Sequence, residues 1–352
     1  MSDSLRVALL GDFKHDTLRG LTINTRRIMK GLIQNGCDVL PISYRNLLLQ
    51  RAAISNVHFA RRFAKDPVDR YCSSFLKAYR PDAVLVLAFR YFDDKTLVRL
   101  REAAPEARFV GWYEDSLDGV GADVQACCRQ LDWITATGAG RRLEALARHC
   151  KVGGAFMPNP CDPDMDRTYP VEGQARRKLL FIGKPSHRHR GTDGSRATLL
   201  AYLRDHAGLK LLGDRSATAV RGLDYYDAIC SADMNLSINA TSDIPMYHSD
   251  RLIHLLACGG FVLASWVPQS ERLFQDGEHL RYFKSQQECV ALIQQYGDDA
   301  AARRQIALQG QSWAYEQFHC RRIAGDMVDL ATRGDYDAPW KVVFPGQAGC
   351  GD

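Results

Sequence analysis

The stretch SDRLIHLLACGGFVLAS, residues 249–265, places a short helical pattern directly before a run that is typical of a β-strand. Apolar side chains recur at helical spacing from Asp250 to Ala257, and Gly259-Gly260 stand where this pattern stops. Two glycines allow the backbone to turn sharply and begin the strand FVLAS. A helix that leads at once into a strand is the repeating unit of an α/β sheet.

Strand-like and helical runs alternate on both sides of this stretch. In the C-terminal half they include KLLFIG at 178–183, GLKLLGD at 208–214, and helices expected at 286–296 and 300–330. In the N-terminal half the strand-like runs are LRVALLGDF (5–13), CDVLPIS (37–43), PDAVLVLAF (81–89), ARFVGWY (107–113) and DWITAT (132–137). This β-α-β-α series predicts doubly wound parallel sheets. The tail after Gly334 is expected to be irregular.

The length and one proline-rich segment predict how the chain is divided. A chain of 352 residues is too long for one ordinary core and suits two domains of roughly 150 residues. The run FMPNPCDPDMDRTYP, residues 156–170, contains four prolines and cannot lie inside a sheet or a helix. We predict an N-terminal domain over 1–157, a linker over 158–177 and a C-terminal domain over 178–320. A C-terminal helix and tail over 321–352 are expected to pack back on the N-terminal domain.

Composition excludes several protein classes. Hydrophobic residues make up 46 % and charged residues 25 %, and no run of about 18 apolar residues predicts a transmembrane helix. The first residues, MSDSLRVALLGDF, lack the features of a signal peptide. The eleven cysteines are scattered, without a C-x-x-C pair or zinc-ligand spacing. We therefore expect a cytoplasmic protein with reduced thiols and no structural metal.

Basic residues are concentrated in one stretch, residues 45–80, although the net charge is only +5. The stretch contains Arg45, Arg51, Arg61, Arg62, Lys65, Arg70, Lys77 and Arg80. Only Asp66 and Asp69 oppose them. This predicts an anionic neighbour, either a membrane, with the protein peripheral at its inner face, or a nucleic acid. The alternative is a solvated helix face.

The region from Lys178 to Leu330 resembles the donor domain of GT-B glycosyltransferases, in particular the glycosyl transferases group 1 and spore-maturation-protein (CgeB-like) branch. The matching pieces are Ala257-Cys258-Gly259, Leu273-Phe274, Gly277-Glu278, and Arg304-Gln305-Ile306-Ala307 with Gly310. In the first half the likeness is architectural, helped by the phrases GWYEDS and MPNPCDP. The resemblance implies two Rossmann-like domains that face a central cleft, with the donor in the C-terminal domain and the acceptor in the N-terminal domain.

A basic loop follows the strand KLLFIG. Gly183 and Lys184 stand at the carboxyl end of this strand, where open α/β sheets bind ligands, and Arg188 and Arg190 follow closely. The resemblance implies that Lys184 and Arg190 contact the donor diphosphate. A leaving nucleoside diphosphate carries about two to three negative charges, which cationic side chains stabilise. The alternative is an exposed basic loop without a ligand.

The helix after Ser249 departs from the commoner pattern of retaining GT-B enzymes. Met246 and His254 stand where those enzymes have two glutamates. His254 can still form a hydrogen bond to a nucleotide but carries no fixed negative charge. The alternative is a hydrogen-bonded helix residue without a catalytic role. The Ser-x-Arg of the spore-maturation-like branch is kept as Ser249 and Arg251, and the resemblance implies that Arg251 contacts phosphate. The remaining predicted donor-binding residues are Asn239, Tyr247 and Gly259.

Carboxylates follow two strands of the N-terminal half. Glu114 and Asp115 come directly after ARFVGWY, and a carboxylate there can act as a base toward an acceptor hydroxyl or orient the sugar. We predict Asp115 as the first candidate and Glu114 as the second. Asp12 and Asn24, at the end of the first strand and of its loop, are expected on the acceptor side. The alternative is that the two carboxylates cap the following segment.

These features predict transfer of a sugar, such as a hexose, from a nucleoside-diphosphate sugar to a hydroxyl of a glycan, lipid, protein or modified nucleobase. No cofactor beyond this co-substrate and no metal are expected, because cations and helix N-termini stabilise the leaving group in GT-B sites. Stereochemistry is left open, with retention preferred by the resemblance. Two alternatives stay open: a sugar-nucleotide epimerase of GT-B architecture, and a catalytically degenerate binding protein. An oxidoreductase is disfavoured because GDFKHD lacks G-x-G-x-x-G.

Overall fold

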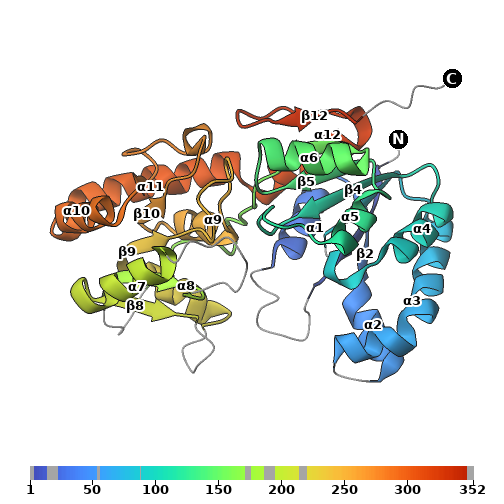
Figure 1. The fold of residues 1–352 in the computed structure, drawn as a ribbon, viewed down its shortest axis with the longest axis horizontal. Coiled ribbons are helices and arrows are strands. Elements are labelled where there is room, and N and C mark those ends of the chain that lie inside the picture. The colour runs from blue at the N-terminus through green and yellow to red at the C-terminus, as the bar shows by residue number, and fades with distance from the viewer. Residues whose placement is uncertain are drawn as a thin grey trace. The chain divides into compact units, whose positions relative to one another are not determined.

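The structure is a computed structural model that describes residues 4–13, 23–53, 56–87, 89–170, 176–185, 195–213 and 220–346. The chain forms two compact units, whose elements are labelled in Figure 1. Unit 1 consists of Met1–Met157 together with Cys320–Asp352, and unit 2 consists of Pro158–His319. The chain therefore leaves unit 1 once and returns to it for its last helix.

Unit 1 is built on a seven-stranded sheet. Its strands are β1 (Arg6–Gly11), β2 (Asp38–Ser43), β3 (Ala83–Val86), β4 (Arg108–Tyr113), β5 (Trp133–Ala136), β6 (Gly153–Phe156) and β12 (Val343–Phe344). Their order is β12-β6-β5-β4-β3-β1-β2, and every neighbouring pair is parallel except β12 with β6. Because β2 and β3 pair with opposite sides of β1, the winding reverses between β1 and β3. Such a reversal opens a crevice for ligands at the carboxyl ends of the strands.

Helices connect the strands of unit 1. They are α1 (Asn24–Gln34), α2 (Tyr44–Ala52), α3 (Val57–Tyr79), α4 (Asp94–Ala103), α5 (Ala122–Cys128), α6 (Arg141–Cys150) and α12 (Cys320–Arg333), with a 3₁₀ turn η2 (Phe89–Tyr91) after β3. α1 ends at Asn35-Gly36, as the sequence predicts, with Gly36 at φ +78°. α12 packs against α1 and also touches β3 and β4.

Unit 2 is built on a five-stranded, wholly parallel sheet. Its strands are β7 (Arg177–Ile182), β8 (Leu209–Leu212), β9 (Ala232–Ser237), β10 (Val262–Ser265) and β11 (Arg281–Phe283). Its helices are α7 (Ser195–His206), α8 (Leu223–Cys230), α9 (Asp250–Ala257), α10 (Gln286–Gly297) and α11 (Ala300–Gln317), with a 3₁₀ turn η3 (Ser270–Arg272). The strand order β11-β10-β9-β7-β8 reverses between β7 and β9, which places the ligand crevice of this unit there.

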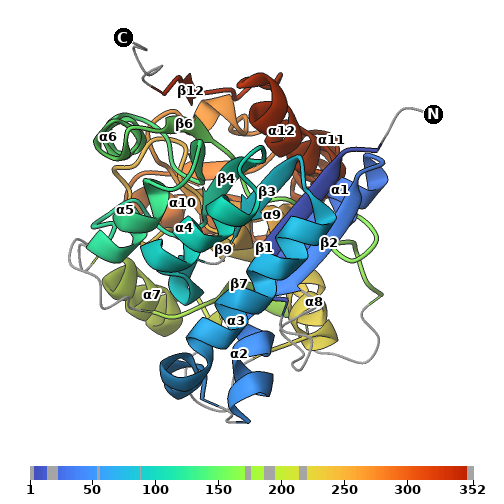
Figure 2. The same ribbon diagram turned by 90° about the vertical axis from the view of Figure 1, so that its right-hand side faces the viewer.

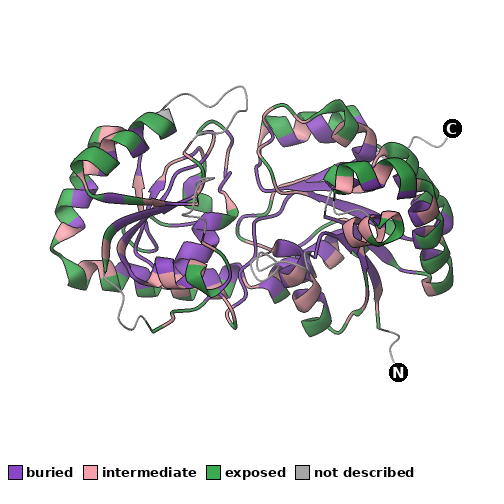
Figure 3. Ribbon diagram, turned by 90° about the horizontal axis from the view of Figure 1, so that it is seen from below, coloured by how far each residue is buried: buried purple, intermediate pink, exposed green. Residues whose placement is uncertain are grey.

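The central strands of both units are largely buried, as their purple colour in Figure 3 shows. In unit 1, Trp112 is among the largest buried side chains, and its Nε1 donates to the carbonyl of Met157 at 3.1 Å. In unit 2, one apolar cluster joins β7, β9 and β10 to α7 and α10, with Leu179 and Leu263 fully buried. Burial on both faces is the physical reason for nearly continuous apolar runs such as PDAVLVLAF.

The predicted doubly wound parallel sheets are confirmed. The continuous helix predicted over 300–330 is wrong, because the chain breaks at Phe318-His319 between α11 and α12. The carbonyl of Phe318 accepts a hydrogen bond from the backbone N–H of Cys161 at 2.7 Å, so the backbone pairs with another segment there instead of continuing the helix. The tail expected to be irregular contains β12, which adds a strand to the sheet beside β6.

The segment predicted as a linker, 158–177, packs on unit 2 over its described part, 158–170. The side chain of Asp166 is buried and accepts a hydrogen bond from Tyr226 Oη at 3.0 Å. Thr168 Oγ1 donates to the carbonyl of Cys258 at 3.1 Å. These contacts attach the segment to the helix ends of unit 2.

Two general properties concern the described part of the chain. None of the helices there is both long and apolar enough to cross a membrane. The cysteines of the described segments carry free thiols, and most of them are buried.

Close contact between α1 and α12 depends on a glycine. A Cβ added at Gly31 would lie 2.1 Å from the carbonyl oxygen of Cys320 and 2.8 Å from Cβ of Ala324. A Cβ added at Gly325, on α12, would come no closer than 3.4 Å to any atom, and that atom belongs to the flexible side chain of Asn35. The two glycines therefore form a matched pair, one indispensable for packing and one replaceable.

We predict that Gly31→Ala lowers the free energy of unfolding by about 1–3 kcal/mol, because overpacking forces the two helices apart. Gly325→Ala is expected to leave it unchanged or to raise it by about 0.5–1 kcal/mol, because alanine favours the helix. Urea unfolding of both variants measures the difference. Equal stabilities would contradict the close α1–α12 contact.

Candidate functional site

Two arginines meet at the reversal point of the unit 2 sheet. Arg196 lies on the first turn of α7 and Arg251 on the first turn of α9. The guanidinium carbon of Arg251 lies 4.4 Å from the ring centroid of Phe181, and that of Arg196 lies 5.0 Å from it. Both side chains are buried, with residue exposures of 5 % for Arg196 and 9 % for Arg251. Cations on an aromatic ring gain from its negative face, but a ring cannot neutralise two full charges.

Backbone carbonyls at the strand ends hold both guanidinium groups. Arg251 Nη1 donates to the carbonyl of Ile238 at 3.1 Å, just after β9. Arg196 Nη2 donates to the carbonyl of Lys184 at 2.5 Å, just after β7. Neither arginine forms an ion pair with a carboxylate within the segments that the structure describes, and Arg196 Nε has no hydrogen-bond partner there.

The electrostatics of the pair are unfavourable without an anion. Burial, followed by the charge of Arg251, lowers the pKa of Arg196 to about 9. Burial likewise lowers the pKa of Arg251. Both directions mean that the protonated form is disfavoured in this environment, chiefly because each cation is removed from water. The neighbouring carboxylate of Asp250 opposes the shift of Arg251 only in part. A phosphate or carboxylate placed beside the pair would reverse the effect.

Gly183 keeps the space beside the arginines open. Its φ is +147°, and a Cβ there would lie 3.1 Å from Nη2 of Arg251 and 3.5 Å from Nη2 of Arg196. Glycine is therefore favoured at the end of β7 for two reasons. It adopts a backbone conformation that other residues rarely adopt, and it has no Cβ that would obstruct a ligand's approach to the two guanidinium groups.

Asn239 fixes the loop that leads into α9. Its Nδ2 donates to the carbonyl of Tyr247 at 2.9 Å, and its Oδ1 accepts from the N–H of Ser249 at 3.2 Å. The loop ends at Ser249, whose buried Oγ has no hydrogen-bond partner in the described part of the chain. Beside it, burial lowers the pKa of His248 to about 3, so this imidazole is neutral at physiological pH. The amide of Asn239 thus positions the start of α9, and with it Arg251.

A cavity of about 410 Å³ lies beside Arg196, at the carboxyl ends of β9, β10 and β11. Its lining includes Asn239, Thr241, Ser265 and Trp266, and no carboxylate is among the lining residues described. The ammonium of Lys284, also in the lining, lies 4.5 Å from the ring centroid of Trp266. Hydroxyl and amide groups around one aromatic ring suit a polar ligand with a flat or ring-shaped part.

The structure brings only part of the predicted donor site together. Gly183, Arg251, Asn239 and the loop through Tyr247 and Ser249 lie around the arginine pair, whereas the side chain of Lys184 is exposed and only its carbonyl takes part. Arg188 and Arg190 lie outside the described residues.

Two of the predicted donor residues lie further along α9. His254 stands one turn after Arg251 and is buried, with its Nδ1 3.2 Å from Tyr225 Oη. Gly259 follows the last turn of α9, and a Cβ there would lie 2.7 Å from Thr168 Oγ1. An eight-residue helix is about 12 Å long, so Gly259 serves the turn into β10 at the end of α9 remote from Arg251.

Arg196 was not among the predicted site residues. It follows the glycine-containing loop after β7, within the run GTDGSRATLL. The available signal was a cation on the first turn of a helix that begins after a glycine-rich loop, which is an arrangement suited to anions.

In unit 1, Glu114 and Asn24 come together at the carboxyl edge of the sheet. Asn24 Nδ2 donates to Glu114 Oε2 at 3.4 Å, and Glu114 is half-buried. Asp12 is buried after β1 and accepts from Tyr91 Oη at 2.8 Å. Asp115, the first candidate from the sequence, is exposed. The geometry therefore favours Glu114 over Asp115 as a positioned carboxylate.

The described segments hold no group of three or more His, Cys, Asp or Glu side chains arranged to bind a metal ion.

Comparison with known proteins adds a family match for the second half of the chain. A family model described as "Glycosyl transferase-like" matches residues 190–329. Among curated proteins, no sequence matches this chain.

Several solved structures share the whole fold. HepE of Anabaena, crystallised with UDP-glucose, has a TM-score of 0.57 at 13 % identity, over 94 % of this chain and 100 % of that chain. Sucrose-phosphate synthase of Thermosynechococcus elongatus has a TM-score of 0.58 at 14 % identity, over 94 % and 98 %. An alpha-glucosyltransferase crystallised with UDP has a TM-score of 0.64 at 10 % identity, over 94 % and 100 %. The chain thus has the GT-B fold of these glycosyltransferases, and residues 190–329 are similar to the glycosyl transferase-like family.

Proposed function

We propose that this protein is a glycosyltransferase that moves a sugar from a nucleoside-diphosphate sugar to an acceptor hydroxyl. The observation that carries the proposal is the pair of buried arginines, Arg196 and Arg251, on the ring of Phe181. Two cations at the reversal point of a parallel sheet, neither of them in an ion pair with a carboxylate of the described residues, suit a ligand with about two negative charges. Both arginines lie within residues 190–329, which match the glycosyl transferase-like family model.

The proposed chemistry needs no metal. The bond from the anomeric carbon to the diphosphate oxygen breaks, the diphosphate keeps the electron pair, and the two guanidinium groups stabilise its growing charge. The N-terminus of α9 adds partial positive charge at the same place. HepE was crystallised with UDP-glucose and the alpha-glucosyltransferase with UDP, so a uridine diphosphate donor with a hexose is the first choice.

The remaining parts of the proposal assign the sugar and the acceptor. The cavity beside Arg196 takes the polar part of the donor next to the diphosphate, against Trp266. Unit 1 supplies Glu114, oriented by Asn24, as the group that deprotonates or orients the acceptor hydroxyl. Retention of configuration, the spore-maturation-like branch and a cytoplasmic location rest on the sequence alone.

Two other functions are distinguished by products. A sugar-nucleotide epimerase would convert the donor without an acceptor, and a degenerate binding protein would bind UDP without releasing it from any donor. Chromatography of a UDP-sugar after incubation with the protein, with and without acceptor hydroxyls, separates the three outcomes. Transfer products would support the proposal, whereas an isomerised donor or an unchanged donor would overturn it.

The first prediction concerns Arg196→Met and Arg251→Met. Each change should weaken UDP binding about 10- to 100-fold, because a charge-assisted contact of about 1.5–3 kcal/mol is lost. Without UDP, each variant should melt at the same or a higher temperature than the parent, because methionine replaces a buried cation that no described carboxylate neutralises. Calorimetric titration and thermal unfolding measure the two effects.

The matched control is Arg204→Met, in the last turn of the same helix as Arg196. Arg204 is exposed and paired with Asp205 at 2.9 Å, so this change should alter neither UDP affinity nor melting temperature noticeably. Parent-like UDP affinity in both site variants would remove the arginine pair from the donor site. If the parent chain binds no nucleoside diphosphate at all, the proposed function fails as a whole.

The second prediction compares Glu114→Gln with Asp115→Asn. Glu114→Gln should leave UDP affinity intact and reduce turnover by about 10² or more, because a positioned carboxylate is lost. Asp115→Asn should reduce turnover far less, because Asp115 is exposed. The rate of UDP release from the donor sugar measures both. The opposite order would return the role to Asp115.

A further inference from the structure

Helix α3 exposes a row of aromatic side chains to solvent. Phe59, Phe63, Tyr71 and Phe75 are 54 %, 68 %, 50 % and 40 % exposed, and all lie on this helix of unit 1. Their spacing of four residues, with Pro67 completing the series, places them on one ridge that turns by about 40° around the helix axis at each step, so Phe59 and Phe63 lie on one side of α3 and Phe75 on another. The ridge is about 24 Å long, at a rise of about 1.5 Å per residue. Exposed apolar side chains that form such a contiguous patch indicate a contact surface.

The ridge is distinct from the face that α3 buries against its own unit. Besides Asp69, the buried positions are Ala60, Ala64, Val68, Cys72 and Leu76, and each of these five follows a ridge position by one residue. They are therefore rotated by about 100° from the ridge. Figures 1 and 2 show α3 on the outside of unit 1, beside α2 and α4. The aromatic ridge is thus not needed for the core of unit 1.

A polar row that contains two arginines runs beside the ridge on its other side. It consists of the exposed residues His58, Arg62, Asp66, Arg70 and Ser74. The guanidinium carbon of Arg62 lies 5.9 Å from the ring centroid of Phe59, and the rings of Tyr71 and Phe75 are 4.6 Å apart. Cations and aromatic rings therefore form one mixed surface.

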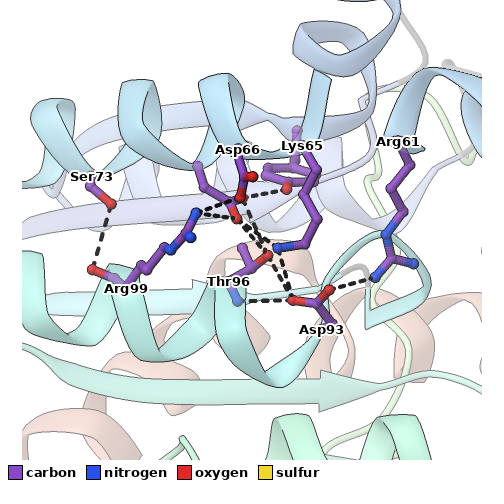
Figure 4. Close-up of polar contacts among 9 residues, drawn as sticks. Arg61, Lys65, Asp66, Ser73, Asp93, Thr96 and Arg99 are labelled. Atoms are coloured by element: carbon purple, nitrogen blue, oxygen red, sulfur yellow. Dashed lines mark hydrogen bonds and ion pairs between the residues drawn. The ribbon is translucent and has the colours of Figure 1, made fainter. Parts of the chain in front are cut away.

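The acids of α3 are occupied by other partners, as Figure 4 shows. Asp66 pairs with Arg99 of α4 at 2.8 Å, and the buried Asp69 accepts from Lys65 at 2.8 Å and from Tyr44 at 2.5 Å. Arg61 and Lys65, two cations of the basic stretch 45–80, pair with Asp93 at 3.2 Å each.

The basic stretch is therefore divided into two parts. Arg61 and Lys65 serve the network between α3 and α4, which is a structural role. Arg62, Arg70 and Lys77 are exposed, and none pairs with a carboxylate of the described residues. The charge left on the outer side of α3 is positive.

We infer that the outer face of α3 binds the surface of an anionic phospholipid membrane. Phe59 and Phe63 would enter the boundary between headgroups and acyl chains. Arg62, Arg70 and Lys77, which lie within about 60° of Phe59 around the helix axis, would contact lipid phosphates. A nucleic acid fits this surface less well. Its phosphates would contact the cations. The phenyl rings of Phe63 and Phe75, which cannot form hydrogen bonds, would then face the polar sugar-phosphate backbone.

The test uses the full chain and phospholipid vesicles, either phosphatidylcholine alone or phosphatidylcholine mixed with phosphatidylglycerol. Co-sedimentation should show binding to the mixed vesicles and much weaker binding to the neutral ones. Phe63→Ser should lower the partition coefficient about tenfold, because a large apolar side chain no longer enters the lipid. Arg62→Ser and Arg70→Ser should each lower it about fivefold at low salt and less at high salt.

Leu308→Ser is the matched control, because Leu308 is a similarly exposed apolar residue, at 55 %, on α11 of unit 2. It should bind vesicles as the parent does. The inference would be overturned if the parent protein did not bind anionic vesicles at low salt. It would also be overturned if the Phe63→Ser variant bound them as tightly as the parent. A gel shift with DNA that Phe63→Ser abolishes would also overturn it, in favour of a nucleic-acid surface.

The inference is independent of the proposed sugar transfer. Vesicle binding depends on α3 in unit 1, whereas UDP binding depends on Arg196 and Arg251 in unit 2. Phe63→Ser should therefore retain parent-like UDP affinity and melting temperature, since Phe63 is 68 % exposed. If the parent protein does not bind UDP, only the donor assignment is overturned. If it does not bind anionic vesicles, only the membrane assignment is overturned.

Discussion

Two guanidinium groups pack on one phenyl ring at the crevice of unit 2, and several features of that sheet edge hold them in place. Taking an ion out of water costs several kcal/mol even after the protein relaxes. The fold meets this cost with carbonyls at the ends of β7 and β9 and with the face of Phe181. Gly183 keeps the backbone clear of both groups, and Asn239 fixes the loop from which Arg251 emerges. Each feature is consistent with the proposed role of the arginines as a charged site that an anion can reach.

A comparison inside the same chain shows what a purely structural charge looks like. Asp69 of α3 is as deeply buried as the arginines, yet Lys65, Tyr44 and Thr96 all donate to its carboxylate. The chain therefore neutralises a buried charge thoroughly where only stability is at stake. At Arg196 and Arg251 the described residues supply carbonyl oxygens and an aromatic face, and Asp250 lies near Arg251, but no described carboxylate forms an ion pair with either arginine. The contrast supports the proposal that Asp69 belongs to the scaffold whereas Arg196 and Arg251 bind an anionic ligand.

The sequence predicted the sheets and the strand ends of the site, because apolar runs and glycines are local signals. It did not find Arg196, since a loop of more than ten residues separates that arginine from Phe181, and no local pattern shows that the two meet. The side chains of adjacent residues after a strand point in different directions. The sequence therefore could not decide whether Glu114 or Asp115 is the positioned carboxylate. Gly259 does form a turn, as its sequence context predicts. Only the structure shows that this turn lies at the end of α9 that is remote from Arg251. The break between α11 and α12 contains neither glycine nor proline and arises from pairing with Cys161.

The order of the segments along the chain has a consequence for biosynthesis. Unit 2 is an insertion within unit 1, because the residues from Cys320 onward belong with the first 157. On the ribosome, all of unit 2 emerges before α12 and β12, so it can finish folding while unit 1 is still incomplete. Until then the outer edge of β6 has no partner strand and the face of α1 that receives α12 is uncovered. The nascent N-terminal sheet thus carries an open strand edge, a site where chains can associate wrongly, for as long as the synthesis of the inserted unit takes.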